Sequence, residues 1–264
     1  MDNLYRLLNI MKTLRDPERG CLWDQQQTFA SIVPYTIEEV YEVADSIDQQ
    51  DYSQLKNELG DLLLQIVYYT QMAREQNLFN FDDVAKSISD KLVRRHPQVF
   101  DDQLNAKVAD WEELKQTERA EKSQYENNSL LSDIPMVMPQ LLRAKKIQKC
   151  VATVGFDWQE VKEVLHKVEE ELVEVKEVMN AQDQASELKQ ARLEEELGDL
   201  LFSVVNLSRH LKVDAEEALR KGNGKFIRRF EHLENKLAAQ GKELKKCDLE
   251  EMETAWENAK LEVG

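Results

Sequence analysis

Acidic residues with the spacing of metal ligands occur twice along this chain. An E-E-x-x-E motif at residues 38–42 is followed by E-L-G-D at 58–61, and the same two motifs recur at 170–174 and 196–199. Repetition of a motif pair within one chain indicates two structural units of the same kind. The paired carboxylates are Glu39, Glu42, Glu58 and Asp61 in the first half, and Glu171, Glu174, Glu196 and Asp199 in the second.

Helical geometry is expected to bring these carboxylates together. Residues three apart on an α-helix differ by about 60° around its axis, so Glu171 and Glu174 share one face. Glu196 and Asp199 share a face in the same way, and both faces lie at the edge of an apolar stripe. If the two helices pack as antiparallel neighbours, the four carboxylates meet beside the core.

Such a cluster of carboxylates needs a cation. Like charges raise one another's pKa unless a positive ion neutralises them. Oxygen ligands without histidine or cysteine suit Mg²⁺, with Mn²⁺ as a substitute. A solvated acidic helix face is the ordinary explanation for one such motif, but duplication at equivalent stripe edges favours a metal site.

Basic and aromatic residues repeat as well. Each pair is four residues apart and therefore shares a helix face. Beside a metal, a Lys/Arg pair is typical of a phosphate clamp, and a Trp offers a surface on which a base stacks. Surface ion pairs and core packing explain each pair alone, but together with the carboxylates they indicate a magnesium–polyphosphate–nucleobase site. The pairs are Lys91 with Arg95, Trp111 with Lys115, Lys225 with Arg229, and Trp256 with Lys260.

Apolar periodicity predicts an all-α chain that positions these residues on neighbouring helices. The apolar stripes, which include Ile37, Leu59, Leu172 and Leu201, are expected to face bundle cores. Helices are predicted over 4–14, from the Thr36–Glu39 capping box after Pro34, over 53–75, from Asp82 to Pro97, over 106–122, from Asp133 with Pro135 in its first turn, over 161–179 and 193–211, from Asp214 to a Gly241 stop, and from Asp248 onward.

The polar segment 124–132 predicts a linker between two tandem helical domains, residues 1–123 and 133–264. Each half offers few helices to enclose a core. That scarcity fits four-helix-bundle cores completed by dimerisation.

Composition excludes several classes of protein. The 264 residues carry 35 Lys+Arg against 51 Asp+Glu, a net charge of −16, which disfavours nucleic-acid binding. Eight Gly and five Pro argue against a sandwich, a barrel or a disordered chain. No apolar run is long enough to span a membrane and no signal-peptide pattern precedes the first helix. Three widely spaced cysteines fit reduced thiols, so we expect a cytoplasmic protein.

In these motifs the chain resembles the two-domain MazG proteins, which are nucleoside triphosphate pyrophosphohydrolases of the all-α nucleotide pyrophosphatase superfamily. The resemblance covers essentially the whole chain. It rests on the acidic motifs and on loop residues 14–17, 20–24, 34–36, 94–97 and 155–158. It implies Mg²⁺-dependent hydrolysis of nucleoside triphosphates to monophosphate and pyrophosphate, as nucleotide-pool house-cleaning. It also implies a helical homodimer with a catalytic C-terminal repeat.

Carried over by motif, the resemblance implies that Glu171, Glu174, Glu196 and Asp199 are the catalytic metal ligands. A stacking Trp would hold any base, so broad base specificity is expected. The implied nucleotide-binding residues are Lys167, Val168, Glu169, Glu170 and Glu171, then Arg192, Leu193, Glu194, Glu195 and Asp199, then Lys225, Phe226, Ile227, Arg228 and Arg229, and finally Trp256 and Lys260.

Three questions stay open at this level. The N-terminal repeat keeps its own carboxylates, although Lys167 and Arg192 beside the second set favour the C-terminal copy. A non-catalytic, regulatory or dimerising helical protein is the alternative from another class. A di-iron carboxylate bundle needs duplicated Glu-x-x-His motifs, whereas Glu163 and His166 supply one such spacing, away from the acidic motifs.

Overall fold

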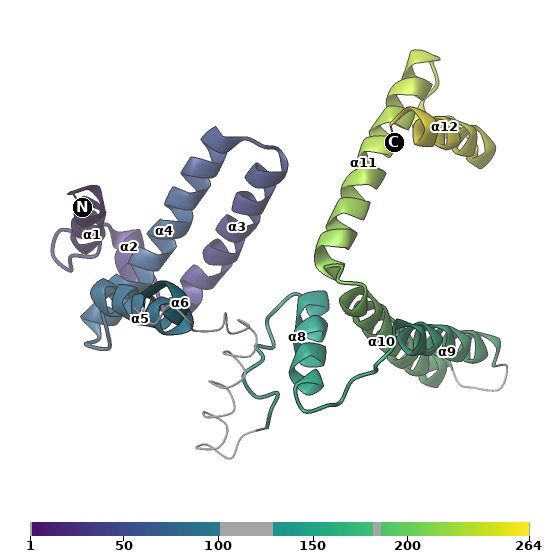
Figure 1. Cartoon of the computed structure of the whole chain (residues 1–264). Coiled ribbons are helices and arrows are strands. Elements are labelled where there is room, and N and C mark those ends of the chain that lie inside the picture. The colour runs from purple at the N-terminus through teal and green to yellow at the C-terminus, as the bar shows by residue number, and fades with distance from the viewer. Residues whose placement is uncertain (1, 101–128, 182–185, 264) are drawn as a thin grey trace. The chain divides into compact units, whose positions relative to one another are not determined.

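The computed structural model describes residues 2–100, 129–181 and 186–263. The chain divides into two compact units, Met1–Lys115 and Gln116–Gly264 (Figure 1). Within the described residues the secondary structure is helical, without strands, as predicted. Nowhere in that part of the chain is a helix both long enough and apolar enough to cross a membrane. The predicted helix 106–122 lies outside the described residues, as does most of the predicted linker.

The first unit is built around a long helical hairpin, α3 with α4 (Figure 1). Helices α1 and α5 pack against α4. The core at this junction consists of Met11, Ile32, Val67, Tyr68 and Met72. The helices of this unit are α1 (Asp2–Leu14), α2 (Leu22–Gln26), α3 (Phe29–Asp48), α4 (Tyr52–Glu75), α5 (Phe81–Arg95) and α6 (Pro97–Phe100).

The second unit contains two helix pairs. Helices α9 and α10 pack along their lengths, α11 packs against α12, and α8 contacts both α10 and α11. Leu233, Leu237 and Ala255 form the core between α11 and α12. The elements are α8 (Gln140–Ala152), α9 (Val161–Asn180), α10 (Ser186–His210), α11 (Ala215–Ala239), the 3₁₀ turn η1 (Leu244–Lys246) and α12 (Leu249–Glu262).

The predicted start of the second helix was wrong. Thr28 is the N-cap of α3 and shares a capping box with Ser31, so Pro34 lies inside the helix. The Thr36 hydroxyl contacts the Ile32 carbonyl oxygen at 3.1 Å and the Tyr69 hydroxyl at 2.9 Å, so it does not cap the helix. The cap at Thr28 satisfies a free N–H group of the first turn. The helix tolerates the loss of one backbone hydrogen bond at Pro34, which has no N–H.

Two further helix starts differ from the prediction. Asn80, rather than Asp82, caps α5, and Asp82 lies in the first turn. No helix begins at Asp133, because residues 130–134 form turns and α8 starts at Gln140. The predicted N-caps Asp214 and Asp248 and the stop at Gly241 are confirmed. Gly241 has φ +73°, a conformation that glycine adopts without strain.

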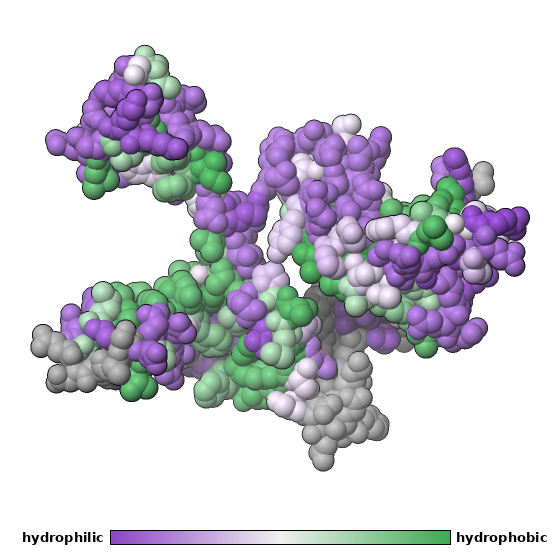
Figure 2. Space-filling model, turned by 180° about the vertical axis from the view of Figure 1, so that it is seen from behind, coloured by the Kyte–Doolittle hydropathy of each residue, from purple (hydrophilic) through white to green (hydrophobic). Residues whose placement is uncertain are grey.

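Most predicted core stripes are exposed within a single chain. Leu172 is 42% exposed and Leu201 is 57% exposed, and Ile37 and Leu59 are exposed in the same way. The pair α9–α10 instead buries Val164, Val175, Val178 and Val205. Two packed helices cover each other along a narrow seam, so the rest of a wide apolar stripe stays open to solvent. Figure 2 shows apolar surface spread over this pair.

Candidate metal and nucleotide site

The packing of α9 against α10 brings three carboxylates of the second acidic set together. Glu171 comes from α9, and Glu196 and Asp199 come from α10. One carboxylate oxygen of each lies within 4.8 Å of the others. The spacing of the two motifs leads to this convergence, because residues three and four apart on each helix face the neighbouring helix.

Glu174 lies one helical turn beyond Glu171 and belongs to the same electrostatic environment. Partial burial, followed by the charges of Glu171 and Glu196, raises the pKa of Glu174 above its usual value. Besides burial, the neighbouring negative charges of Glu171 and Glu196 therefore favour the protonated form of Glu174.

Glu171 is the buried member of the cluster, at 4% exposure. Its Oε1 forms an ion pair with the ammonium of Lys167 at 2.7 Å. Its Oε2 is buried and has no hydrogen-bond partner. A buried carboxylate oxygen without a partner is unfavourable, and an oxygen-seeking divalent cation would satisfy it. These donors therefore fit a Mg²⁺ or Mn²⁺ ion.

Lys167 precedes Glu171 by one turn of α9 and also donates a hydrogen bond to Glu170 Oε1 at 2.9 Å. These contacts, first with Glu171 and then with Glu170, raise the pKa of the Lys167 ammonium. The ammonium is therefore charged at any physiological pH. It lies in direct contact with a carboxylate that could bind metal.

The other residues of the two flanking segments differ in exposure. Glu169 is exposed and contacts His166 at 3.3 Å. Val168 and Leu193 are half-buried, whereas Arg192, Glu194 and Glu195 are exposed. In the described part of the chain, Arg192 forms no hydrogen bond or ion pair with the carboxylates.

The basic and aromatic residues lie on α11 and α12. Phe226 contacts Phe230 and Trp256, with ring centroids 6.1 Å and 5.0 Å away respectively. Trp256 is therefore packed against a neighbouring ring and only half-buried, and Lys260 pairs with Glu257. Helix α11 runs without interruption through Gly222 and Gly224.

The structure does not join this second group to the carboxylates within one chain. Among the described residues, Lys225, Arg228 and Arg229 form no hydrogen bond or ion pair with the acidic cluster. Lys225, Ile227 and Arg228 are exposed. The Nε of Arg229 is buried without a hydrogen-bond partner, so this donor could bind an anion.

The first acidic set forms a related cluster on α3 and α4. One oxygen each of Glu39, Glu58 and Asp61 lies within 4.8 Å of the others. Burial, followed by the charges of Asp61 and Glu58, raises the pKa of Glu39, and burial and Glu58 raise the pKa of Glu42. Glu58 is 6% exposed and accepts a hydrogen bond from the Gln54 amide.

The structure describes two of the four basic and aromatic residues of the first repeat. Lys91 and Arg95 are half-buried on α5. Trp111 and Lys115 lie outside the described residues.

Two polar networks that the motif spacing did not indicate anchor the helix pairs. Arg209 and His210, at the end of α10, bond Asp157 just before α9, with the Arg209 Nη1 at 2.8 Å. In the first unit, Tyr68 donates to Asp24 Oδ1 at 2.6 Å and Arg15 pairs with Glu75. For the second unit, the opposite charges of Asp157 before α9 and Arg209 at the end of α10 were the available signal.

Glu163 and His166, the di-iron alternative, do not enter a carboxylate cluster of the described residues. Glu163 Oε2 accepts the backbone N–H groups of Gln159 and Glu160 and so caps α9. His166 contacts Glu169 instead of the acidic cluster.

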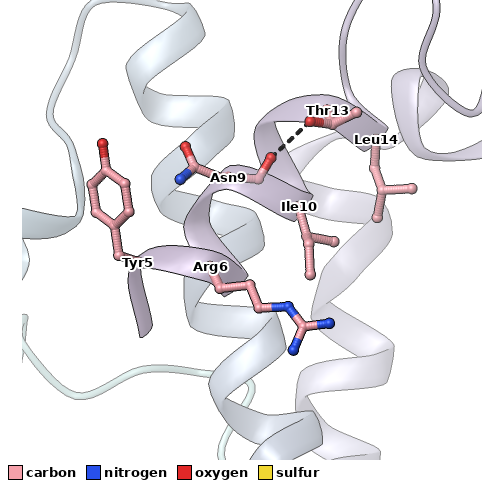
Figure 3. A pocket seen from close by; sticks show the side chains of 6 residues that line it. All are labelled: Tyr5, Arg6, Asn9, Ile10, Thr13 and Leu14. Atoms are coloured by element: carbon pink, nitrogen blue, oxygen red, sulfur yellow. Dashed lines mark hydrogen bonds between the residues drawn. The ribbon is translucent and has the colours of Figure 1, made fainter. Parts of the chain in front are cut away.

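Two cavities of the first unit lie away from the acidic clusters. One, of about 490 Å³, is lined along one side of α1 by Tyr5, Arg6, Asn9, Ile10, Thr13 and Leu14 (Figure 3). The other, of about 570 Å³, lies among α1, α4 and the start of α5. No carboxylate of either acidic set is among their described lining residues.

Comparison with known proteins identifies a family for both units. The family model for the MazG nucleotide pyrophosphohydrolase domain matches residues 27–100 and 159–234, one match in each unit. The chain is 52% identical to a nucleoside triphosphate pyrophosphohydrolase of Escherichia coli K12 over 264 residues, 98% of each chain. It is 43% identical to a nucleoside triphosphate pyrophosphohydrolase/pyrophosphatase MazG of Thermotoga maritima over 254 residues, 96% of this chain and 94% of that one.

Proposed function

This chain belongs to the MazG nucleotide pyrophosphohydrolase family, and we propose that it is a Mg²⁺-dependent enzyme that hydrolyses nucleoside and deoxynucleoside triphosphates to monophosphate and pyrophosphate. The observation that carries the proposal is the buried, unpartnered Oε2 of Glu171 beside Glu196 and Asp199. Such an oxygen favours a bound cation over a solvated acidic helix face.

Glu171, Glu174, Glu196 and Asp199 would hold the metal. When bound, a divalent ion lowers the pKa of a water molecule and offsets negative charge on phosphate oxygens. In the proposed reaction the oxygen of water forms a bond to the α-phosphorus and the bond from that phosphorus to the bridging oxygen breaks. The bridging oxygen leaves with pyrophosphate, and a carboxylate of the cluster, for which Glu171 is our candidate, accepts the proton of the water.

The cations on α11 would bind the departing pyrophosphate. Lys225 is exposed and Arg229 has an unsatisfied buried donor, so both can neutralise anionic oxygens. Lys167 and Arg192 add positive charge beside the carboxylates. The free face of Trp256 would stack on a base without selecting one, which favours broad specificity. The remaining motif residues would line the pocket around these groups.

We also propose a homodimer. Within one chain the α9–α10 pair leaves Leu172, Leu197 and Leu201 exposed, and the α3–α4 pair leaves Ile37 and Leu59 exposed. Apolar faces of this width are covered in a four-helix bundle, which a second copy of each pair would complete. The three free cysteines fit a reducing compartment, so a cytoplasmic location belongs to the same proposal.

We assign turnover to the C-terminal repeat, because its carboxylates have a lysine within reach of a phosphate. In the described part of the N-terminal site, the buried Glu58 is paired with the neutral Gln54. We keep residues 1–123, 124–132 and 133–264 as the proposed first domain, linker and catalytic domain.

Product analysis tests the proposal directly. The full chain with Mg²⁺ and a panel of canonical and modified triphosphates should release pyrophosphate and the matching monophosphate. Release of a nucleoside diphosphate and orthophosphate instead would refute it. So would no reaction from a folded dimer. The second result would favour a non-catalytic nucleotide-binding protein.

A further inference from the structure

Lys167 occupies an unusual place for a substrate-binding residue. Its ammonium lies 2.7 Å from Glu171 Oε1, and this carboxylate is the most buried of the acidic cluster. The second contact of Lys167, with Glu170 at 2.9 Å, is at the surface. Lys167 therefore bridges a potential metal ligand and an exposed carboxylate, on a side chain long enough to change partners.

The N-terminal repeat shows that a buried glutamate in this fold does not require a lysine. The buried glutamate there is Glu58, which occupies the motif position of Glu196 rather than that of Glu171, and the amide of Gln54, one turn earlier on α4, donates to it. A neutral amide orients a carboxylate without cancelling its charge. The lysine of the C-terminal repeat does both, so its charge needs a separate explanation.

A lysine and a divalent cation compete for the same carboxylate. A metal bound to Glu171 and its neighbours would lie within a few ångströms of the ammonium, since both contact the same carboxylate group. Like charges at that distance repel, even where solvent screens them well. A triphosphate offers the ammonium new oxygen partners, so that the ammonium could leave Glu171 when a nucleotide binds.

We propose that Lys167 is an exchangeable counter-ion: its ammonium neutralises Glu171 while the site holds no nucleotide, and moves to phosphate oxygens when a metal–triphosphate complex binds. This inference rests on the proposed function of the same site. The ammonium stays protonated throughout, so charge moves but no proton is transferred. The consequence is that metal binding and triphosphate binding are coupled. The metal binds weakly alone and tightly with the triphosphate, and by linkage the metal raises the affinity for the triphosphate by the same factor.

Direct measurement of metal binding tests this coupling. We would titrate Mn²⁺ into the nucleotide-free full chain and follow the free ion by electron paramagnetic resonance. The background carries Glu58→Gln and Asp61→Asn, so that the N-terminal cluster does not contribute. In that background Lys167→Gln should bind Mn²⁺ about tenfold more tightly than the parent, from the loss of a like charge near the ion.

The matched control is Lys162→Gln. Lys162 is exposed on the same helix, well away from Glu171, and its replacement removes the same unit of net charge. This variant should change the Mn²⁺ dissociation constant less than twofold. Lys167→Arg should restore weak binding, because it restores the positive charge. Circular dichroism on each variant confirms that the helices remain.

The second measurement is the coupling itself. A triphosphate analogue with a non-hydrolysable α–β bridge should tighten Mn²⁺ binding to the parent by a larger factor than to Lys167→Gln, with the two factors differing about tenfold. An unchanged or weaker Mn²⁺ affinity in Lys167→Gln overturns the inference, since Lys167 would then only orient Glu171. If neither the parent nor Lys167→Gln binds Mn²⁺, with or without the analogue, the proposed function fails together with the inference.

Discussion

Replacement of Glu171 by glutamine should make the metal-free protein more stable while it abolishes metal-dependent hydrolysis. In the wild-type chain this side chain is 4% exposed and its Oε2 has no hydrogen-bond partner. A glutamine of the same shape can direct its amide oxygen toward Lys167 and its amide N–H groups toward the neighbouring carboxylates. The substitution therefore supplies donors exactly where negative charge is crowded, without creating a cavity.

The magnitude follows from three contributions. A buried acceptor without a partner costs about 1–3 kcal/mol, which the variant recovers in part. Loss of the ion pair with Lys167 costs less than about 1 kcal/mol, because the lysine side chain is 32% exposed and solvent screens the pair. Relief of repulsion from Glu174 and Glu196 adds to the gain. We expect a net stabilisation of about 1 kcal/mol in EDTA.

Magnesium should reverse this order. A ligand that binds the native state alone stabilises it by about 2.7 kcal/mol at a concentration of 100 times its dissociation constant. The wild-type chain has this gain and Glu171→Gln lacks most of it, so the wild type becomes the more stable protein. Urea unfolding with EDTA and with saturating Mg²⁺, read by circular dichroism, measures both differences in the free energy of unfolding.

Pyrophosphate release from the same samples completes the test, and we expect a loss of at least about a hundredfold. Two results would contradict the reasoning. A loss of several kcal/mol in EDTA would mean that the carboxylate of Glu171 is needed for folding. Undiminished hydrolysis would remove it from the metal site.

Three further predictions concern the choice of repeat, a polar network and the dimer. Glu174→Gln should abolish Mg²⁺-dependent pyrophosphate release with the helical content unchanged, whereas the equivalent Glu42→Gln should retain it, and the opposite pattern would move the active site to the first repeat. Asp157→Asn should lower the free energy of unfolding by about 1–2 kcal/mol at pH 7. Although burial opposes it, hydrogen bonds from Arg209 and His210 lower the pKa of Asp157. The contribution of Asp157 to the free energy of unfolding is therefore present above the unfolded-state pKa and should fade as the pH falls through the lowered value. A pH-independent difference between the variant and the wild type would refute the assignment. Leu201→Glu should shift the sedimentation mass toward a monomer, whereas Lys162→Gln should not, and an unchanged mass for Leu201→Glu would place the dimer contact elsewhere.

Local patterns were enough to predict the helical class, the duplication and the meeting of carboxylates from two helices. The reason is that the 3.6-residue period is a property of the backbone, so residues three or four apart share a face whatever surrounds them. Caps such as Asp214 and Asp248 are predictable on the same ground, since a side chain satisfies an N–H group two or three residues away.

Burial and pairing depended on the tertiary structure. The motif treats Glu171 and Glu196 as equals, yet packing buries the first and leaves the second half-exposed. Leu172 and Leu201 fit a core pattern but stay exposed, because a pattern marks an apolar face without saying what covers it. Lys167 and Glu171 meet because they lie four residues apart on α9, but whether Arg229 lies near the carboxylates depends on contacts far along the chain or in another subunit. Helical period acts over a single turn, whereas burial is the sum of contacts that the whole fold brings together.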